Sequence, residues 1–201
     1  MGATAKPPSW TVTLVCGASG VGKSSVAIPL ARQYGTPLAE VDDIVMALKA
    51  VTTAEHLPLL HYWDMHPEAG SWGPEKIAEL HLAVAEMLRP AFEAVIADHL
   101  KFRSPVVFEG GYLLPEVAAG FGGAVRAVVL DEPDEDRIVA NFRVREPHVG
   151  EQPGRARVSV LIGAHMAERA SLCGVPVVAP RPWPEVLDRV DRVLRATPDR
   201  Q

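Results

Sequence analysis

A run of glycines near the N-terminus is spaced so that backbone N–H groups can surround a phosphate. Residues 17–24 read GASGVGKS, which matches the pattern G-x-x-x-x-G-K-[ST] at every fixed position. Glycines let such a loop curl with its N–H groups pointing inward, and the helix that follows adds its positive end. The alternative is a chance match in a glycine-rich turn, but an apolar run before the motif and a helical stretch after it give the required context.

The residues of this loop have distinct expected roles. Lys23 is expected to reach the β- and γ-phosphates of ATP and to be catalytic, and the Ser24 hydroxyl is expected to bind Mg²⁺. ATP and Mg²⁺ are therefore the expected cofactors. The residues expected to contact the nucleotide from this loop are Gly17, Ala18, Ser19, Gly20, Val21, Gly22, Lys23, Ser24 and Ser25.

Two adjacent carboxylates are candidates for work on an acceptor molecule. Asp42 and Asp43 follow a short apolar run at 37–41, and ligands bind at the carboxyl ends of strands in open α/β sheets. An Asp there can orient or deprotonate an acceptor hydroxyl, or hold Mg²⁺ through water. The alternative is a helix N-cap for residues 44–50. At least one of the two is predicted to be catalytic, and Asp42 is expected to have the stronger effect because it leaves the strand first.

A third carboxylate, Glu109, follows the apolar run at 105–108 and is expected to reach the same edge of the sheet. It is predicted to be catalytic, either by polarising a Mg²⁺-bound water or by accepting a hydrogen bond from the acceptor. Gly110 and Gly111 would let the backbone approach the acceptor closely. The alternative for these glycines is a tight turn that requires positive φ.

Arginines gather around a proline- and glycine-rich break at 146–154. They are Arg137, Arg143, Arg145, Arg155 and Arg157. The pattern is typical of a mobile lid whose guanidinium groups neutralise charge on a transferring phosphoryl group. The alternative is a solvated helix face paired with nearby acids. Arg137 and Arg143 are predicted to bind the nucleotide, and Arg143 is predicted to be catalytic as well.

Two aromatic segments each leave alternative interpretations open. Residues 56–72 contain three histidines, a tyrosine and two tryptophans, but their spacing fits no metal-ligand pattern. A flap over an organic acceptor, or plain packing, is favoured over a metal site. The segment RPWP at 181–184 either packs beside the adenine ring or forms a proline-stiffened loop.

Short apolar runs alternate with amphipathic stretches along the chain. The candidate strands are 11–16, 37–41, 105–108, 125–130 and 175–179. The candidate helices are 23–34, 74–88, 90–100, 133–143, 155–172 and 184–194. Continuous apolar strands of this kind suit a parallel sheet that is buried on both faces, so the alternation predicts an α/β fold.

The spacing of these elements narrows the class of protein. Residues 42–104 separate the second and third strands by far more than one crossover needs, so we expect an acceptor-binding insertion there. We expect a lid region at 134–172, and a single domain over 1–201. The segment VVLDEP at 128–133 resembles the metal-binding strand of a transporter ATPase, but the sequence has no LSGGQ-like signature. It also has no N-K-x-D or T-K-x-D motif, which argues against a GTPase.

Composition limits the partners and the compartment. The chain has 201 residues, a net charge of −5 and two cysteines. This charge is unfavourable for non-specific nucleic-acid binding, and two cysteines without zinc spacing fit a reducing compartment. No targeting or membrane-spanning segment is visible. We therefore expect a soluble cytoplasmic protein that binds neither membrane nor nucleic acid, and its oligomeric state is left open.

Four segments resemble the adenylate-kinase-like group of P-loop small-molecule kinases, and within it the 2-phosphoglycerate-kinase-like proteins. They are GASGVGKSS at 17–25, FEGGYLLPE at 108–116, NFRVRE at 141–146 and HMAERASLCGVPVV at 165–178. The resemblance implies a P-loop NTPase three-layer sandwich around a five-stranded parallel sheet in the order 2-3-1-4-5, with a helical substrate insertion and a lid.

The expected function is that of an ATP-dependent phosphotransferase. It would move the γ-phosphoryl of ATP to a hydroxyl or phosphate on a small-molecule acceptor. Two alternatives remain open at this stage: a nucleotide-binding regulatory ATPase module, and a nucleoside monophosphate kinase. The insertion and the arginine cluster favour a phosphotransferase, but nothing in the sequence names the acceptor.

Overall fold

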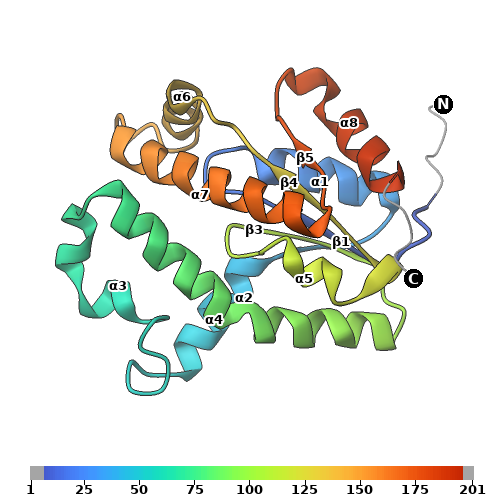
Figure 1. Cartoon of the computed structure of the whole chain (residues 1–201), viewed down its shortest axis with the longest axis horizontal. Helices are drawn as coiled ribbons and strands as arrows, with labels where there is room; N and C mark the ends of the chain where they lie inside the picture. The colour runs from blue at the N-terminus through green and yellow to red at the C-terminus, as the bar shows by residue number, and fades with distance from the viewer. Residues whose placement is uncertain (1–6, 197–201) are drawn as a thin grey trace.

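The sheet of the computed structural model has five parallel strands, and the structure describes residues 7–196. The strands are β1 (Val12–Cys16), β2 (Leu38–Glu40), β3 (Val106–Gly110), β4 (Val125–Leu130) and β5 (Val177–Val178). They are ordered β2-β3-β1-β4-β5, and every pairing is parallel. The predicted fold class and strand order are therefore confirmed (Figure 1).

The three central strands lie in the core. Every residue of β1, β3 and β4 is buried, as expected for a parallel sheet covered on both faces. Cys16, the last residue of β1, pairs with Gly110 of β3 and with Val129 of β4. This register places the loop that begins at Gly17 between the carboxyl ends of its two neighbours.

Helices cover both faces of the sheet. Those on one face are α1 (Lys23–Tyr34) and α8 (Trp183–Ala196), and those on the other are α4 (Pro74–Lys101), α5 (Glu116–Ala119) and α7 (Pro153–Cys173). The remaining helices are α2 (Val41–Val51), α3 (Tyr62–Met65) and α6 (Glu135–Arg145), with short 3-10 turns η1 (Pro67–Ser71) and η2 (Gly122–Ala124). Figure 1 shows α3 and α6 at the same side of the molecule, beyond the strand ends.

Several predicted boundaries shift. The helices predicted at 74–88 and 90–100 are one helix, α4, which includes Pro90. Pro90 and Glu86 are both exposed, so water can offset the hydrogen bond that proline removes at the Glu86 carbonyl. Helix α6 begins at Glu135 rather than at Pro133, because the Asp134 side chain caps it by accepting a hydrogen bond from the backbone N–H of Arg137.

Helix α7 belongs to the core for most of its length. Its buried residues include Ile162, Met166 and Ala170. On the same helix, Arg169 forms ion pairs with Glu86 of α4 and Glu116 of α5. This packing anchors α7 against the rest of the core. The lid predicted over 134–172 stays a prediction.

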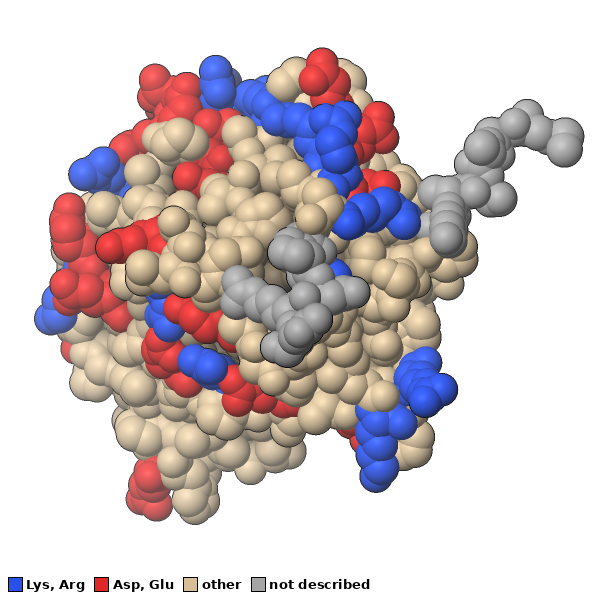
Figure 2. Space-filling view, turned by 45° about the vertical axis from the view of Figure 1, so that its right-hand side comes forward, with Lys and Arg blue, Asp and Glu red and all other residues tan. Residues whose placement is uncertain are grey.

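The surface mixes charges of both signs. On the face shown in Figure 2, Lys and Arg side chains gather in a band across the upper part and in a further group at the lower right, with Asp and Glu side chains beside the band and on the left. Among the helices of residues 7–196, none combines the length and the apolar character that a membrane crossing requires.

Candidate active site

The loop between β1 and α1 has the backbone that a phosphate-binding loop requires. Gly20 and Gly22 have φ of 79° and 92°, a left-handed conformation that glycine adopts without strain. The side chains of Ala18 and Val21 are fully buried and anchor the loop in the core. Helix α1 begins at Lys23, so its positive N-terminal end faces the loop.

Bulky neighbours lie so close to two loop glycines that a side chain would not fit. A Cβ atom on Gly22 would lie 2.1 Å from the Trp183 ring, and one on Gly20 would lie 2.8 Å from the Phe142 ring. The Asn141 side chain also donates a hydrogen bond of 2.8 Å to the Gly20 carbonyl. Residues of α6 and α8 therefore fix the shape of the loop.

Lys23 lies in the loop with acidic groups around it. Its ammonium donates a hydrogen bond of 2.9 Å to the Ala18 carbonyl. Burial lowers the pKa of Lys23, and the negative charges of Glu109 and Asp42 act in the opposite direction. A half-buried lysine held against phosphate-binding backbone is suited to pair with the phosphates of a nucleotide.

Ser24 and Glu109 form a hydroxyl–carboxylate pair beside Lys23. The Ser24 hydroxyl donates a hydrogen bond of 2.6 Å to Glu109 Oε1, and Glu109 is only 6% exposed at the end of β3. Two oxygen-bearing side chains next to a phosphate loop match the donor atoms that Mg²⁺ prefers. The residues present therefore fit a magnesium ion bound together with a nucleotide.

Gly110 serves close packing rather than positive φ. A turn follows at residues 111–112, but neither Gly110 nor Gly111 has positive φ, so the part of the alternative that required positive φ is wrong. A Cβ atom on Gly110 would lie 2.3 Å from Cγ2 of Val41, so glycine lets the start of α2 pack against β3. Beside Gly111, the nearest atoms to such a Cβ, at 3.8–3.9 Å, belong to His81 and to the Gly17 carbonyl.

Asp42 and Asp43 lie in the first turn of α2. The helix begins at Val41 and its N-cap is Glu40, so the interpretation of the aspartates as an N-cap is wrong. Both carboxylates instead complement the positive end of the helix. The charge of Asp42 acts on Lys23, His81 and Tyr112, which places it by the loop. The catalytic role of either aspartate stays a prediction.

His81 and Tyr112 are site residues that the sequence analysis missed. Their rings stack with centroids 4.3 Å apart, and His81 Nε2 lies 3.0 Å from the Gly111 carbonyl oxygen. Burial lowers the pKa of His81, the Gly111 hydrogen bond acts against this, and Lys23 lowers it further. The only sequence signal was the place of His81 on the apolar face of α4, where it could not be told from a packing residue.

A cavity of about 350 Å³ opens beside the loop. Beyond loop residues, its lining comes from α6 and from the start of α8, through Asn141, Val144, Arg145 and Trp183. Val144 is 84% exposed although it is apolar. An apolar side chain and an indole facing one cavity next to a phosphate loop suit a flat ring such as a nucleotide base.

Of the arginines of α6, the two predicted to bind the nucleotide, Arg137 and Arg143, do not line this cavity, and their roles stay predictions. Arg143 is 71% exposed and its nearest ionic partner is Glu151, at 4.0 Å. Arg137 pairs with Glu132 and Asp134. Neither arginine lines the cavity, whereas Arg145 does. Among the arginines of α6, Arg145 is therefore the one that lines this cavity.

Glu146 joins two arginines at the end of α6. Its Oε1 accepts a hydrogen bond of 2.6 Å from Arg145, and its Oε2 accepts one of 2.7 Å from Arg155. The hydrogen bond from Arg145 is the main reason why the pKa of Glu146 falls to about 2. Arg155 also lies over the Phe142 ring and reaches Ser19 Oγ, 3.4 Å away.

A second cavity, of about 380 Å³, has Arg155 among its lining residues. Its lining comes from the insertion, from the start of α4 and from the start of α7. The residues are Trp63, Gly70, Trp72, Pro74, Ile77, Gly154, Arg155 and Val158. The tryptophans of segment 56–72 thus face a cavity, and the described residues include no cluster of three or more potential metal ligands.

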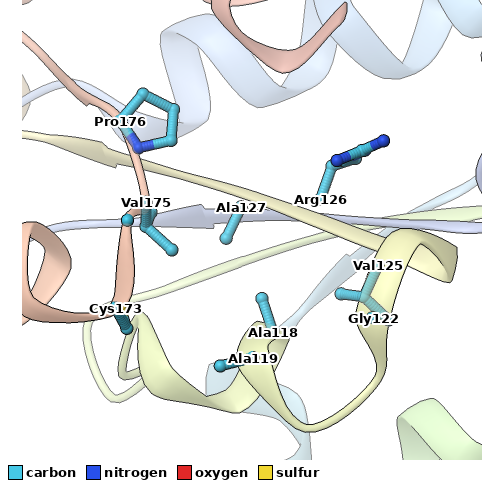
Figure 3. A pocket seen from close by; sticks show the side chains of 10 residues that line it. Ala118, Ala119, Gly122, Val125, Arg126, Ala127, Cys173, Val175 and Pro176 are labelled. Atoms are coloured by element: carbon cyan, nitrogen blue, oxygen red, sulfur yellow. The ribbon is translucent and has the colours of Figure 1, made fainter. Parts of the chain in front are cut away.

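A third cavity lies at the opposite edge of the sheet, between the start of β4 and the turn before β5 (Figure 3). Its volume is only about 20 Å³, with Val125, Cys173 and Pro176 among the residues that line it. That volume holds about one water molecule. It is too small for a nucleotide or an organic acceptor.

Comparison with known proteins supports the fold. No protein-family model matches the sequence, and no curated protein matches it. A gluconokinase from Sinorhizobium meliloti 1021 is 19% identical, with a TM-score of 0.53 over 96% of this chain and 95% of that one. TT1252 from Thermus thermophilus is 17% identical, with a TM-score of 0.57 over 95% and 98%.

A shikimate kinase from Acinetobacter baumannii, solved in complex with shikimate, is 12% identical, with a TM-score of 0.53 over 94% of this chain and 93% of that one. At these identities the likeness establishes the fold alone. The chain therefore has the α/β fold of the P-loop kinases that act on small molecules, with the sheet order 2-3-1-4-5.

Proposed function

We propose that this protein is an ATP-dependent phosphotransferase that moves the γ-phosphoryl group of ATP to a hydroxyl or phosphate on a small molecule. The observation that carries the proposal is a pair of cavities, one lined by Arg145 and the other by Arg155, whose two arginines both bond to Glu146. A nucleotide switch or a simple hydrolase needs one cavity, whereas a transferase needs a place for the donor and one for the acceptor.

In this proposal the first cavity binds ATP. The loop backbone and Lys23 bind its phosphates, and its base lies by Trp183 and Val144. Ser24 and Glu109 hold Mg²⁺ by their oxygen atoms. When bound there, Mg²⁺ would neutralise negative charge on the β- and γ-phosphates.

Transfer requires the acceptor oxygen to approach the γ-phosphorus in line with the bond to the leaving oxygen. Asp42 accepts the proton of the acceptor hydroxyl as its oxygen bonds to phosphorus, and ADP leaves with the electron pair of the broken bond. Arg145 is placed to neutralise the charge that spreads over the moving group. His81 orients the Gly111 backbone beside the acceptor.

The resemblance to 2-phosphoglycerate-kinase-like proteins supports this reaction class but does not assign the acceptor. A regulatory ATPase would hydrolyse ATP in response to a protein and to no small molecule. A nucleoside monophosphate kinase would need a nucleotide in the second cavity, where Arg155 is the one charged group among the described lining residues.

The test is an ADP-release screen with ATP, Mg²⁺ and panels of hydroxy acids, polyols, nucleoside monophosphates and hydroxylated aromatic compounds. We expect ADP release to depend on one acceptor class. ADP release that is independent of every acceptor would contradict the proposal. The nucleotide affinity of wild-type protein, measured by calorimetry, shows separately whether the first cavity binds ATP.

A further inference from the structure

The second cavity has walls that suit a ring rather than a polyol. Two indoles, Trp63 and Trp72, face it together with the aliphatic side chains of Ile77 and Val158. Its volume of about 380 Å³ lies within the range of small-molecule sites. Most hydroxyl groups of a sugar acid bound there would lose their hydrogen bonds to water and contact carbon atoms instead. That loss is unfavourable.

The indole of Trp72 is held in place before any ligand arrives. The Lys76 ammonium lies 3.3 Å from the centre of its ring, and the Tyr62 ring lies 5.7 Å away on a tilted plane. A wall that is already ordered loses little side-chain entropy on binding. Because Lys76 occupies one face of the indole, a ligand would contact the rest of the ring.

One charged group gives the cavity a polar end. Of the described residues that line it, Arg155 alone is charged. Its Nη1 is engaged by Glu146 and Gln152, but its Nη2 has only a long contact, 3.4 Å, to Ser19 Oγ. Two arginines share the single charge of Glu146, so this end of the cavity keeps positive charge for an anion.

One face of α4 connects this cavity to the phosphate loop. Ile77 lines the cavity, and His81, one turn further along the same face, contacts the Gly111 backbone. The two positions are separated by about 6 Å along the helix. A molecule in the cavity that extends by about one helical turn would therefore bring a hydroxyl group beside His81 and Gly111.

From these features we infer that the acceptor is a hydroxylated compound with an apolar ring and an anionic group, the ring lying against the indoles and the anion against Arg155. The inference rests on the proposed phosphotransferase function and adds the acceptor class. It sets this chain apart from an enzyme for small polyols or sugar acids.

The test is a matched set of probes that separates the ring from the charge. Phenyllactate carries both, lactate lacks the ring, and phenylethanol lacks the carboxylate. Calorimetry on protein saturated with Mg²⁺ and an unhydrolysable ATP analogue should show phenyllactate binding about tenfold or more tightly than lactate, because a phenyl ring leaves water. Phenylethanol should also bind more weakly than phenyllactate. Equal binding of phenyllactate and lactate, or no binding of either, overturns the inference.

Variants locate the binding. Val158→Phe should fill the cavity and weaken phenyllactate binding about tenfold, with the affinity for the ATP analogue unchanged. Trp63→Ala should weaken phenyllactate binding by a similar factor, because one wall of the cavity is lost. Trp63→Phe should keep most of the wild-type affinity for phenyllactate. Leu172→Ala, at an exposed position of the same helix, is the control. A preference for phenyllactate that neither Val158→Phe nor Trp63→Ala reduces overturns the inference.

A transfer assay with the same compounds separates this inference from the proposed function. Phosphorylation of lactate and other small hydroxy acids as efficiently as phenyllactate overturns the inference and leaves the phosphotransferase function standing. Binding of phenyllactate that depends on Trp63, without ADP release from any acceptor in the panels, supports the ring-binding cavity and overturns the function.

Discussion

The Ser24 hydroxyl donates a hydrogen bond of 2.6 Å to Oε1 of Glu109, a residue 85 positions away in the sequence. The contact joins the first turn of α1 to the end of β3 and is shielded by the burial of Glu109. It brings a hydroxyl and a carboxylate together beside Lys23. This pair is where the proposed magnesium ion and the phosphate loop meet.

Replacing Glu109 by Gln should reduce turnover by about 100-fold, because the amide keeps the hydrogen bond from Ser24 but loses the negative charge next to the metal. The variant should also need more Mg²⁺ for half-maximal activity. Steady-state kinetics at increasing Mg²⁺ measures both effects. Glu79→Gln, an exposed position on α4, is the control, and an unaltered Mg²⁺ requirement in Glu109→Gln would argue that Glu109 only shapes the loop.

Two arginines of α6 offer a matched comparison. Arg145→Ala should weaken ATP binding by about tenfold or more, because the variant removes a charge-assisted contact from the nucleotide cavity. Arg143→Ala should leave the affinity within about twofold, since its side chain lies in solvent. Calorimetric titration with an unhydrolysable ATP analogue measures both. The reverse order would mean that α6 turns when the nucleotide binds.

Asp42→Asn should slow phosphoryl transfer by about 100-fold or more while ATP affinity is kept, because the amide cannot accept the proton of the acceptor. Asp43→Asn should have the smaller effect, since the charge of Asp42 is the one that acts on Lys23 and His81. Single-turnover kinetics separates transfer from ATP binding. Loss of ATP affinity in Asp42→Asn, with transfer intact, would assign this carboxylate to the metal or to the fold.

Protonation of His81 should make the fold less stable at acidic pH. Its pKa in the folded protein is lowered, chiefly by burial, so the unfolded chain takes up the proton first as the pH falls. The contribution of neutral His81 to the free energy of unfolding is therefore complete above its pKa in the unfolded chain, about 6.5. It declines as the pH falls toward the lowered pKa of His81 in the folded protein. The groups that act on it are Lys23, Asp42 and the Gly111 carbonyl.

Thermal unfolding followed between neutral and mildly acidic pH tests this dependence. The melting temperature of wild-type protein should fall with pH more steeply than that of His81→Asn, which cannot be protonated in this range. His56→Asn, at an exposed position, should behave like wild type. Parallel pH profiles for wild type and His81→Asn would show that His81 is not the titrating group.

Local sequence signals predicted most of the fold. The fully buried strands β1, β3 and β4 are continuous apolar runs, and such runs are typical of a central parallel sheet. The strand order came from the resemblance to P-loop kinases, and the structure confirms it. The phosphate loop was found from its motif, since positive φ at fixed positions demands glycine.

The rest of the candidate site depends on contacts that no local pattern carries. Arg143 and Arg145 are two residues apart, and only the packing of α6 against the loop decides which one faces the cavity. The stack of His81 on Tyr112 joins α4 to the segment after β3. The tryptophans were recognised as a group, but the cavity that they line also needs α7.

Transfer of label from ATP carrying radioactive γ-phosphorus is the most direct measurement of the central claim. With wild-type protein, Mg²⁺ and the acceptor class selected in the screen, the label should appear in the acceptor in proportion to the ADP formed. In Lys23→Ala this transfer should fall by orders of magnitude, because the lysine charge no longer pairs with the phosphates. Label that appears only as inorganic phosphate, or transfer that is unchanged in Lys23→Ala, would contradict the account.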